Sequence, residues 1–112
     1  MKLQKPDRRR LALGHTTVDL DAHRIETGNQ ELHLTPTEWT LLEHLASHLN
    51  RTVRSTELVR ALWGLDAGKG VHSLRVFIKS LRHKIEPYPA RPQYILTDPR
   101  LGYRLQVPDG GT

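Results

Sequence analysis

The chain has 112 residues, of which 37% are hydrophobic and 26% charged, and its formal net charge is +5. This length accommodates one small domain with a single core, and a second full domain does not fit. Cysteine is absent, which excludes disulfides and thiolate metal sites and favours a reducing, cytoplasmic setting. No apolar run exceeds three residues, which excludes a membrane span and the core of a secretory signal in this sequence.

Charge is distributed unevenly along the chain. Residues 1–10 carry five Lys or Arg and one Asp, residues 11–70 carry five against eight Asp or Glu, and residues 71–104 carry seven against two. A basic start and a basic C-terminal third around an acidic middle are typical of proteins that bind a polyanion. A solvated surface with a chance bias would give the same totals, so charge alone leaves both interpretations open.

Residues 1–10, MKLQKPDRRR, are polar and lack periodicity, which predicts a tail or the stub of an interdomain linker. Apolar and polar residues then alternate over 17–20, 24–26 and 31–34. This pattern predicts an antiparallel meander with one solvated face. So small a sheet needs a helical layer over its apolar face.

The helical layer is predicted to begin at Thr35, an N-cap residue followed by Pro36 in the first helical position. Glu38 is placed to complete a capping box with Thr35. The first helix should face the core with an apolar stripe made of Trp39, Leu42, Leu45, Ala46 and Leu49.

A short extended link over 51–54 leads to a second helix, which Ser55 is expected to cap and Gly64 to end. The glycine-rich LDAGKG at 65–70 predicts a turn. Residues 71–86, VHSLRVFIKSLRHKIE, contain neither glycine nor proline and predict a third helix with two opposed faces. Its inner face carries Leu74, Ile78, Leu81 and Ile85, and its outer face carries His72, Arg75, Lys79, Arg82, His83 and Glu86.

The segment EPYPARP ends this helix, and QYILT and YRLQV on either side of DPRLG predict a hairpin. The order of small sheet, three helices and hairpin predicts an α+β winged helix-turn-helix. Arg100 lies at the hairpin turn, where an arginine suits a wing that enters a minor groove or holds the DNA backbone. Tyr103 lies just past the turn, a position where tyrosine more often packs than binds.

Three cations share the outer face of the third helix, because Arg75, Lys79 and Arg82 are spaced i, i+4, i+7. In a major groove such cations can meet phosphates or guanine edges. Solvated helix faces usually mix charges of both signs, and here only Glu86 opposes the cations. Beside them, Val76 could pack on a thymine methyl and Ser80 could bond a base edge.

No catalytic, cofactor or metal site is predicted. His44 and His48 are spaced i, i+4, but Leu45 stands where a zincin motif needs glutamate, and the sequence offers no evident third ligand. A nucleophile elbow, a P-loop and a G-x-G-x-x-G motif are all absent. An enzyme is therefore the least favoured class.

Three segments together resemble a known family: LTPTEWTLLEHLASHLNRTVRSTELVRALWG, SLRVFIKSLRHKIE and GYRL. They are similar to the winged-helix effector domain of the OmpR/PhoB class of bacterial two-component response regulators, over residues 11 to about 107. The motifs L-T-x-x-E, W-G, L-R-x-x-I/L and G-Y-R occur in order at suitable separations. Within the class, PARPQYILTDPRLGYRL is most similar to the ending of the regulator of a potassium-uptake operon.

The resemblance implies a four-stranded N-terminal sheet, three helices and a C-terminal hairpin wing. It divides the chain into a linker at 1–10, a DNA-binding domain at 11–107 and a tail at 108–112, with a phosphorylatable receiver domain upstream in the full-length protein. It implies a recognition helix over 71–86, a loop over Leu65 to Gly70 that touches RNA polymerase, and tandem dimers on direct-repeat DNA formed by a domain that is a monomer in isolation. Residues expected to bind DNA are Trp63, His72, Ser73, Arg75, Val76, Lys79, Ser80, Arg82, His83, Thr97, Arg100 and Tyr103.

Two positions depart from the family pattern. Ser80 stands where arginine is often found, and PRLGY replaces the common R-G-x-G-Y, which puts Arg100 in place of the first glycine. The expected function is sequence-specific binding of duplex DNA to control transcription, in the cytoplasm and associated with the nucleoid. The alternative is a winged helix that docks on RNA polymerase or a receiver domain, although Val76 is the only apolar residue expected on the outer face of the third helix.

Overall fold

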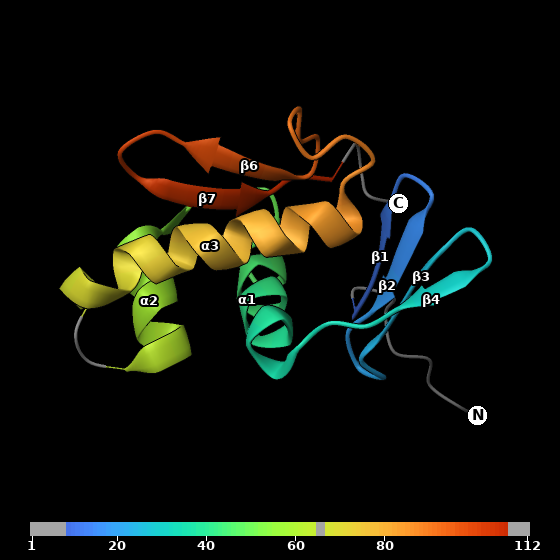
Figure 1. Cartoon of the computed structure of the whole chain (residues 1–112), viewed down its shortest axis with the longest axis horizontal. Coiled ribbons are helices and arrows are strands. Elements are labelled where there is room, and N and C mark those ends of the chain that lie inside the picture. Colours follow the sequence, from blue (N-terminus) through green and yellow to red (C-terminus); the bar gives the residue numbers. More distant parts are fainter. Residues whose placement is uncertain (1–8, 65–66, 108–112) are drawn as a thin grey trace, which may run out of the picture.

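The computed structural model describes residues 9–64 and 67–107. A four-stranded antiparallel sheet comes first, in the order β1 (Arg10–Leu13), β2 (Thr16–Asp19), β3 (Arg24–Thr27), β4 (Gln30–Leu32) (Figure 1). The elements that follow are α1 (Pro36–Ala46), β5 (Val53–Arg54), α2 (Ser55–Trp63), α3 (Ala67–Ile85), β6 (Ile95–Asp98) and β7 (Gly102–Leu105). Strand β7 lies between β5 and β6 in a second sheet. The predicted α+β winged-helix architecture is confirmed.

In Figure 1, α3 lies along the long axis of the molecule, the β6–β7 hairpin runs above it, and the four-stranded sheet lies beyond its C-terminal end. Arg10 already belongs to β1. Of the linker predicted over residues 1–10, residues 1–8 lie outside the described residues, as does the tail predicted over 108–112. None of the described helices is both long and apolar enough to cross a membrane.

The first sheet has one buried and one solvated face, as its alternating sequence predicts. Leu11 lies opposite Val18, Val18 lies opposite Ile25, and all three are buried. Thr17 and Glu26, which alternate with them, are exposed. The buried face joins a single hydrophobic core shared with the helices and the hairpin.

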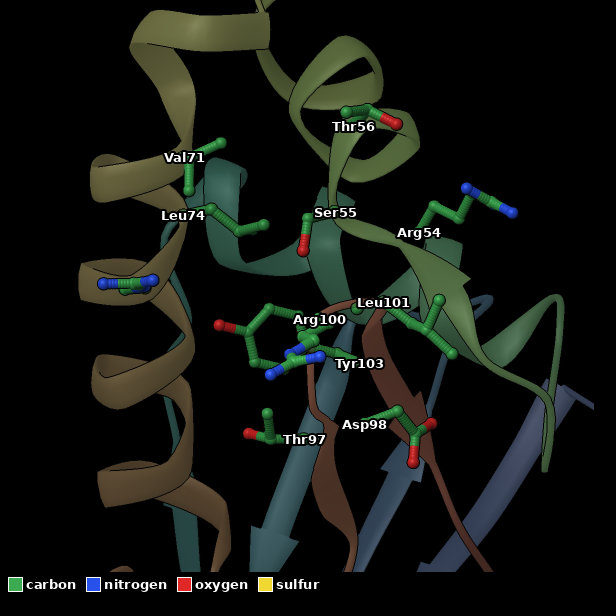
Figure 2. Close-up of a pocket in the computed structure, with 12 residues that line it drawn as sticks. Arg54, Ser55, Thr56, Val71, Leu74, Thr97, Asp98, Arg100, Leu101 and Tyr103 are labelled. Carbon is green, nitrogen blue, oxygen red and sulfur yellow. The ribbon is translucent and has the colours of Figure 1, made fainter.

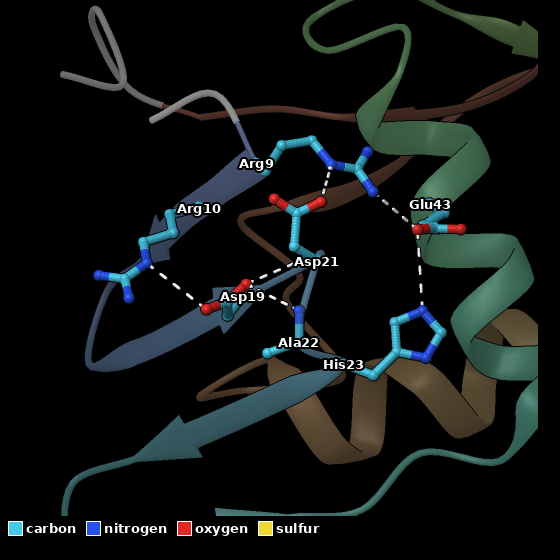
Figure 3. Close-up of polar contacts among 7 residues, drawn as sticks. All are labelled: Arg9, Arg10, Asp19, Asp21, Ala22, His23 and Glu43. Carbon is cyan, nitrogen blue, oxygen red and sulfur yellow. Dashed lines mark hydrogen bonds and ion pairs between the residues drawn. The ribbon is translucent and has the colours of Figure 1, made fainter. Parts of the chain in front are cut away.

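Polar contacts, drawn in Figure 3, and one aromatic stack attach this sheet to α1. Arg9 donates to Asp21 Oδ1 at 2.8 Å and to Glu43 Oε2 of α1 at 3.0 Å. The His23 ring stacks on Trp39 of α1 with 4.5 Å between ring centroids. The start of the domain is therefore held by the first helix as well as by strand pairing.

Local sequence signals start α1 as predicted. Thr35 Oγ1 accepts the Glu38 N–H at 3.2 Å, and the Glu38 carboxylate accepts the Thr35 N–H at 2.9 Å, so the capping box is confirmed. The helix ends at Ala46, which leaves Leu49 in the following turn, only partly buried. The buried apolar face of α1 consists of Trp39, Leu41, Leu42 and Leu45.

The start of α2 differs from the prediction. Arg54 is the N-cap, Ser55 is the first helical residue, and no side chain caps the helix. The backbone accounts for this, because Arg54 pairs with β7 and the Ser55 N–H donates to the Leu101 carbonyl at 3.0 Å. Contacts with β7 and the residue before it therefore orient the first turn of α2 in place of a capping side chain. Gly64 follows the last helical residue, as predicted.

The start of α3 is also earlier than predicted. Residues 67–70 are helical, so the turn predicted there is wrong, and Leu65 and Asp66 lie outside the described residues. Gly70 is buried against α2, where an added Cβ would lie 2.3 Å from Val59 Cγ1. This glycine therefore permits close packing of two helices and does not mark a turn.

The inner face of α3 is confirmed, since Leu74, Ile78, Leu81 and Ile85 are each at most 3% exposed. Glu86, predicted on the outer face, is instead 5% exposed. Because α3 ends at Ile85, Glu86 turns toward the returning chain. Its carboxylate accepts three backbone N–H groups at 2.7–2.9 Å, from Gln93, Tyr94 and Ile95.

Candidate nucleic-acid interface

The outer surface of α3 carries cations on a rigid helix. Arg75 and Lys79 are exposed one helical turn apart, and Val76 beside them is 53% exposed. Ser73 is half-buried. The residues that α3 presents to solvent, called here the exposed face of α3, are His72, Arg75, Val76, Lys79 and His83.

Arg82, predicted to extend from the same face, turns toward the hairpin. Its Nε donates to the Ile95 carbonyl at 2.8 Å and its Nη2 to Thr97 Oγ1 at 3.0 Å. Burial lowers the pKa of this guanidinium from its usual value, but arginine keeps its charge in proteins. Arg82 and Thr97, both predicted to bind DNA, thus join α3 to β6.

Ser80, predicted to reach a base edge, faces α1 instead. Its hydroxyl donates to Glu38 Oε2 at 2.5 Å, and Lys84 Nζ lies 2.7 Å from Glu38 Oε1. Burial of Glu38 would raise its pKa, but hydrogen bonds from Lys84, Ser80 and the Thr35 N–H outweigh burial and lower it. The short side chain of Ser80 thus satisfies a buried carboxylate, and its contact with a base edge stays a prediction.

The wing turn explains the unusual position of Arg100. The Leu101 N–H donates to the Asp98 carbonyl at 3.0 Å, and Arg100 has φ 67° directly after Pro99. Proline followed by a positive φ is the pattern of a type II turn, which favours glycine at its third position. Arg100 occupies that strained position, exposed at the tip.

The base of the wing is tightly constrained. Asp98 accepts two hydrogen bonds at 3.1 Å from the Arg104 guanidinium and one from Thr52, and the bonds from Arg104 are the main cause of its lowered pKa. At Gly102, an added Cβ would lie 1.9 Å from the Val53 carbonyl oxygen. Only glycine allows β5 and β7 to approach this closely.

Tyr103 is mainly a packing residue. It is 8% exposed, lies opposite Val53 and Thr97 in the sheet, and its hydroxyl points toward α3 in Figure 2. Thr97 is exposed beside it. The exposed part of Tyr103 lines the cleft between α2, α3 and the wing.

A cleft of about 370 Å³ lies between the start of α2, α3 and the wing (Figure 2). Three arginines line it from three elements: Arg54 from β5, Arg75 from α3 and Arg100 from the wing turn. Three arginines around one cleft favour a polyanion, although the Arg54 side chain in Figure 2 extends away from α3. The sequence analysis did not select Arg54. The available signal was its position directly before a helix, because a cation there and the N-terminus of the helix attract the same anion.

Trp63, which the family resemblance assigns to a phosphate, ends α2 and is 42% exposed. Its ring lies tilted against Phe77 of α3, 5.7 Å between centroids. This contact holds the indole beside α3. Of the loop predicted to touch RNA polymerase, residues 67–70 are the first turn of α3, and the remaining two lie outside the described residues.

The sequence matches the family described as "Transcriptional regulatory protein, C terminal" over residues 29–105. The chain belongs to this family of transcriptional regulators. The matched region runs from the β3–β4 turn to the end of β7 and so contains α3, the cleft and the wing. This match confirms the predicted membership of a transcriptional-regulator family, and the matched region is the C-terminal one that the resemblance implied.

Within this family, the transcriptional regulatory protein KdpE of Mycobacterium tuberculosis (strain H37Rv) is 40% identical over 91 residues. The KDP operon transcriptional regulatory protein KdpE of Escherichia coli (strain K12) is 38% identical over 91 residues. Both alignments cover 81% of this chain and 40% of the relative. The chain thus spans about two fifths of the length of these curated relatives.

Solved structures of the family share the fold. The RstA DNA-binding domain of Klebsiella pneumoniae, in complex with the RstA box, matches with a TM-score of 0.74 and 23% identity, over 88% of this chain and 97% of that one. DrrB of Thermotoga maritima, described as an OmpR/PhoB homolog, matches with a TM-score of 0.76 and 24% identity, over 88% and 45%. The DNA-binding domain of Escherichia coli CpxR matches with 0.70 and 26%, over 87% and 95%.

Proposed function

We propose that this chain is the DNA-binding half of a bacterial two-component response regulator, and that it binds a specific duplex sequence through α3 and the wing to control transcription. The observation that carries the proposal is the exposed face of α3, which is cationic and lies beside a wing tipped by Arg100. No acidic residue occurs between positions 71 and 85. A helix of this kind fits the width of a major groove.

The residues divide into three proposed roles. Arg75 and Lys79 enter the major groove, where they bind guanine edges or phosphates, and Val76 contacts a thymine methyl. Arg100 and Trp63 hold the DNA backbone on either side. His72, Ser73, His83 and the edge of Tyr103 lie where they can add contacts, whereas Ser80, Arg82 and Thr97 support the interface from within.

Finer parts of the proposal draw on the relatives. Their greater length supports a receiver domain in the full protein, and the similarity to KdpE supports control of an operon of the KDP type. We propose tandem binding to direct repeats by a domain that is a monomer alone, with RNA polymerase contacting the region from Leu65 to Gly70. These assignments concern the full-length protein, of which this chain is one part.

Binding is tested by selecting duplexes from a randomised pool and titrating the chain against selected and random DNA at several salt concentrations. Arg75→Ala and Lys79→Ala should each weaken binding to the selected duplex by about 1–3 kcal/mol if the side chain reads a base, or reduce the slope of log K against log salt by about 1 if it holds a phosphate. Arg24→Ala is the matched control, since it removes an exposed cation from β3.

The proposal fails if both α3 variants bind like the wild type, or if Arg24→Ala weakens binding equally. Equal, weak binding to selected and random duplexes would favour the alternative of a winged helix that docks on proteins. Sequence preference combined with a salt slope that depends on α3 supports DNA recognition.

A further inference from the structure

Three metal-binding side chains meet at the junction of α1 and α2. One ring nitrogen from each of His44 and His48 and one carboxylate oxygen of Glu57 lie within 4.8 Å of one another. His44 belongs to α1, His48 to the turn after it, and Glu57 to the first turn of α2. The sequence motif did not reveal the third donor, Glu57, because this residue belongs to the next helix.

The hydrogen bonds of His48 prepare it as a ligand. Its Nδ1 lies 3.1 Å from the His44 carbonyl oxygen, which can only accept, so Nδ1 carries the proton. Ser47 Oγ, also near Nδ1, donates its own proton to the same carbonyl at 2.8 Å. His48 therefore presents the lone pair of Nε2, and a carbonyl partner on the other ring nitrogen is the usual outer contact of a metal-bound histidine.

The other two donors are close and accessible. His44 Nε2 lies 2.8 Å from Glu57 Oε2, and the side chains are 26% and 50% exposed. Ligands of a tetrahedral zinc ion lie about 3.3 Å apart, given bonds of about 2.0–2.1 Å, so small side-chain rotations suffice to enclose an ion.

We propose that His44, His48 and Glu57 form a binding site for a divalent transition-metal ion of the Zn²⁺ type, which ties the end of α1 to the start of α2. Two imidazoles and one carboxylate suit Zn²⁺, Ni²⁺ or Cu²⁺ and are a poor set for Mg²⁺, which prefers oxygen ligands. The inference is independent of DNA binding, because the three residues lie outside the exposed face of α3 and the wing.

The test uses the 112-residue chain without an affinity tag, titrated with zinc chloride in an isothermal calorimeter. We expect saturable binding of one Zn²⁺ per chain and no binding of Mg²⁺. His44→Ala, His48→Ala and Glu57→Gln should each weaken zinc binding at least about tenfold. Matched controls are His15→Ala and Glu26→Gln, which replace an exposed histidine and an exposed glutamate elsewhere and should leave zinc affinity unchanged.

Thermal unfolding gives a second measurement. Zinc at a hundredfold excess over its wild-type Kd should raise the Tm of the wild type by about 10 °C and that of His48→Ala by at most about half as much. The proposal is overturned if the wild type shows no saturable site, if the controls lose as much affinity as the ligand variants, or if His48→Ala retains full affinity. In those cases His44 and Glu57 form a simple ion pair.

Discussion

Arg82 joins the two parts of the interface. A cation on the exposed side of a recognition helix is an obvious phosphate ligand, yet its guanidinium donates to a carbonyl and a hydroxyl of β6. Charged hydrogen bonds in a half-buried setting stabilise a fold more than exposed ones do. In the proposed function, the side chain therefore contributes to DNA binding by fixing the position of the wing relative to α3.

Arg82→Ala should lower the free energy of unfolding by about 2 kcal/mol, because two charge-assisted hydrogen bonds are lost. DNA affinity should fall while the salt slope stays at the wild-type value. Urea denaturation and salt-dependent DNA titration measure the two effects, and Arg75→Ala is the contrasting variant, with normal stability. A reduced slope at unchanged stability in Arg82→Ala would identify a direct phosphate contact instead.

Arg100 combines a strained backbone with an exposed charge. Arg100→Gly should raise the free energy of unfolding by up to about 1 kcal/mol, because glycine adopts the positive φ without strain. The same change should weaken DNA binding and lower the preference for A·T-rich flanks, where a narrow minor groove attracts arginine. Arg100→Lys should retain most nonspecific affinity.

The test compares the wild type, Arg100→Gly and Arg100→Lys on duplexes that differ only in flank composition, at one salt concentration. Equal losses on every flank would reduce Arg100 to a plain phosphate contact. If Arg100→Gly binds all duplexes like the wild type, the wing does not touch DNA.

At the scale of elements, the close contact between α2 and α3 depends on Gly70. Its buried Cα leaves no room for a side chain beside Val59. Helix packing distance is set by the residues at the contact, so this glycine determines how far α3 stands from α2. Since α3 carries the exposed face, the same contact determines where that face meets a ligand.

Gly70→Ala should lower the free energy of unfolding by about 1–3 kcal/mol through overpacking, despite a gain of about 1 kcal/mol in helix propensity. Chemical denaturation measures the change. The double variant Gly70→Ala/Val59→Ala provides the control, because it removes the colliding methyl groups. It should be more stable than the sum of the single effects predicts; strict additivity would show that the two residues do not collide.

At the scale of the whole molecule, Glu38 links parts of the chain that are remote in sequence. It closes the capping box of α1, accepts from Ser80 and pairs with Lys84, which also donates to the His33 carbonyl at 3.0 Å. One buried carboxylate thus joins α1, α3 and the segment that leaves the first sheet. Its ionisation stabilises the folded state because its folded pKa is lowered.

Glu38→Gln should lower the free energy of unfolding by about 1–3 kcal/mol at pH 7. Because the folded pKa lies below the ordinary 4.5, this stabilisation is complete above that pH and is lost as pH falls through the folded pKa. The difference between variant and wild type should therefore shrink below about pH 4.5. Urea melts from pH 7 to 3 measure it, with Glu26→Gln as control; a constant difference would exclude the ionised carboxylate as its source.

Signals within a few residues predicted most of the fold. The capping box at Thr35, the inner face of α3 and the alternating strands depend on neighbours one to four positions away, so composition and spacing revealed them. The hydrogen bonds of Arg82 and Ser80 within the fold were not predicted, because their partners lie 13 and 42 residues away. Gly70 resembled a turn residue because only the folded structure shows the helix packed against it.

Glu86 has a consequence for how the molecule tolerates change. Its carboxylate joins the end of α3 to the first residues of the wing, which are separated by the short segment PYPARP at 87–92. The end of α3 and the wing therefore meet through a side chain, and the intervening loop does not have to set their spacing. Insertions, deletions or a protease cut within 87–92 should leave their relative geometry intact, which makes this loop a site for attaching a probe or a fused domain.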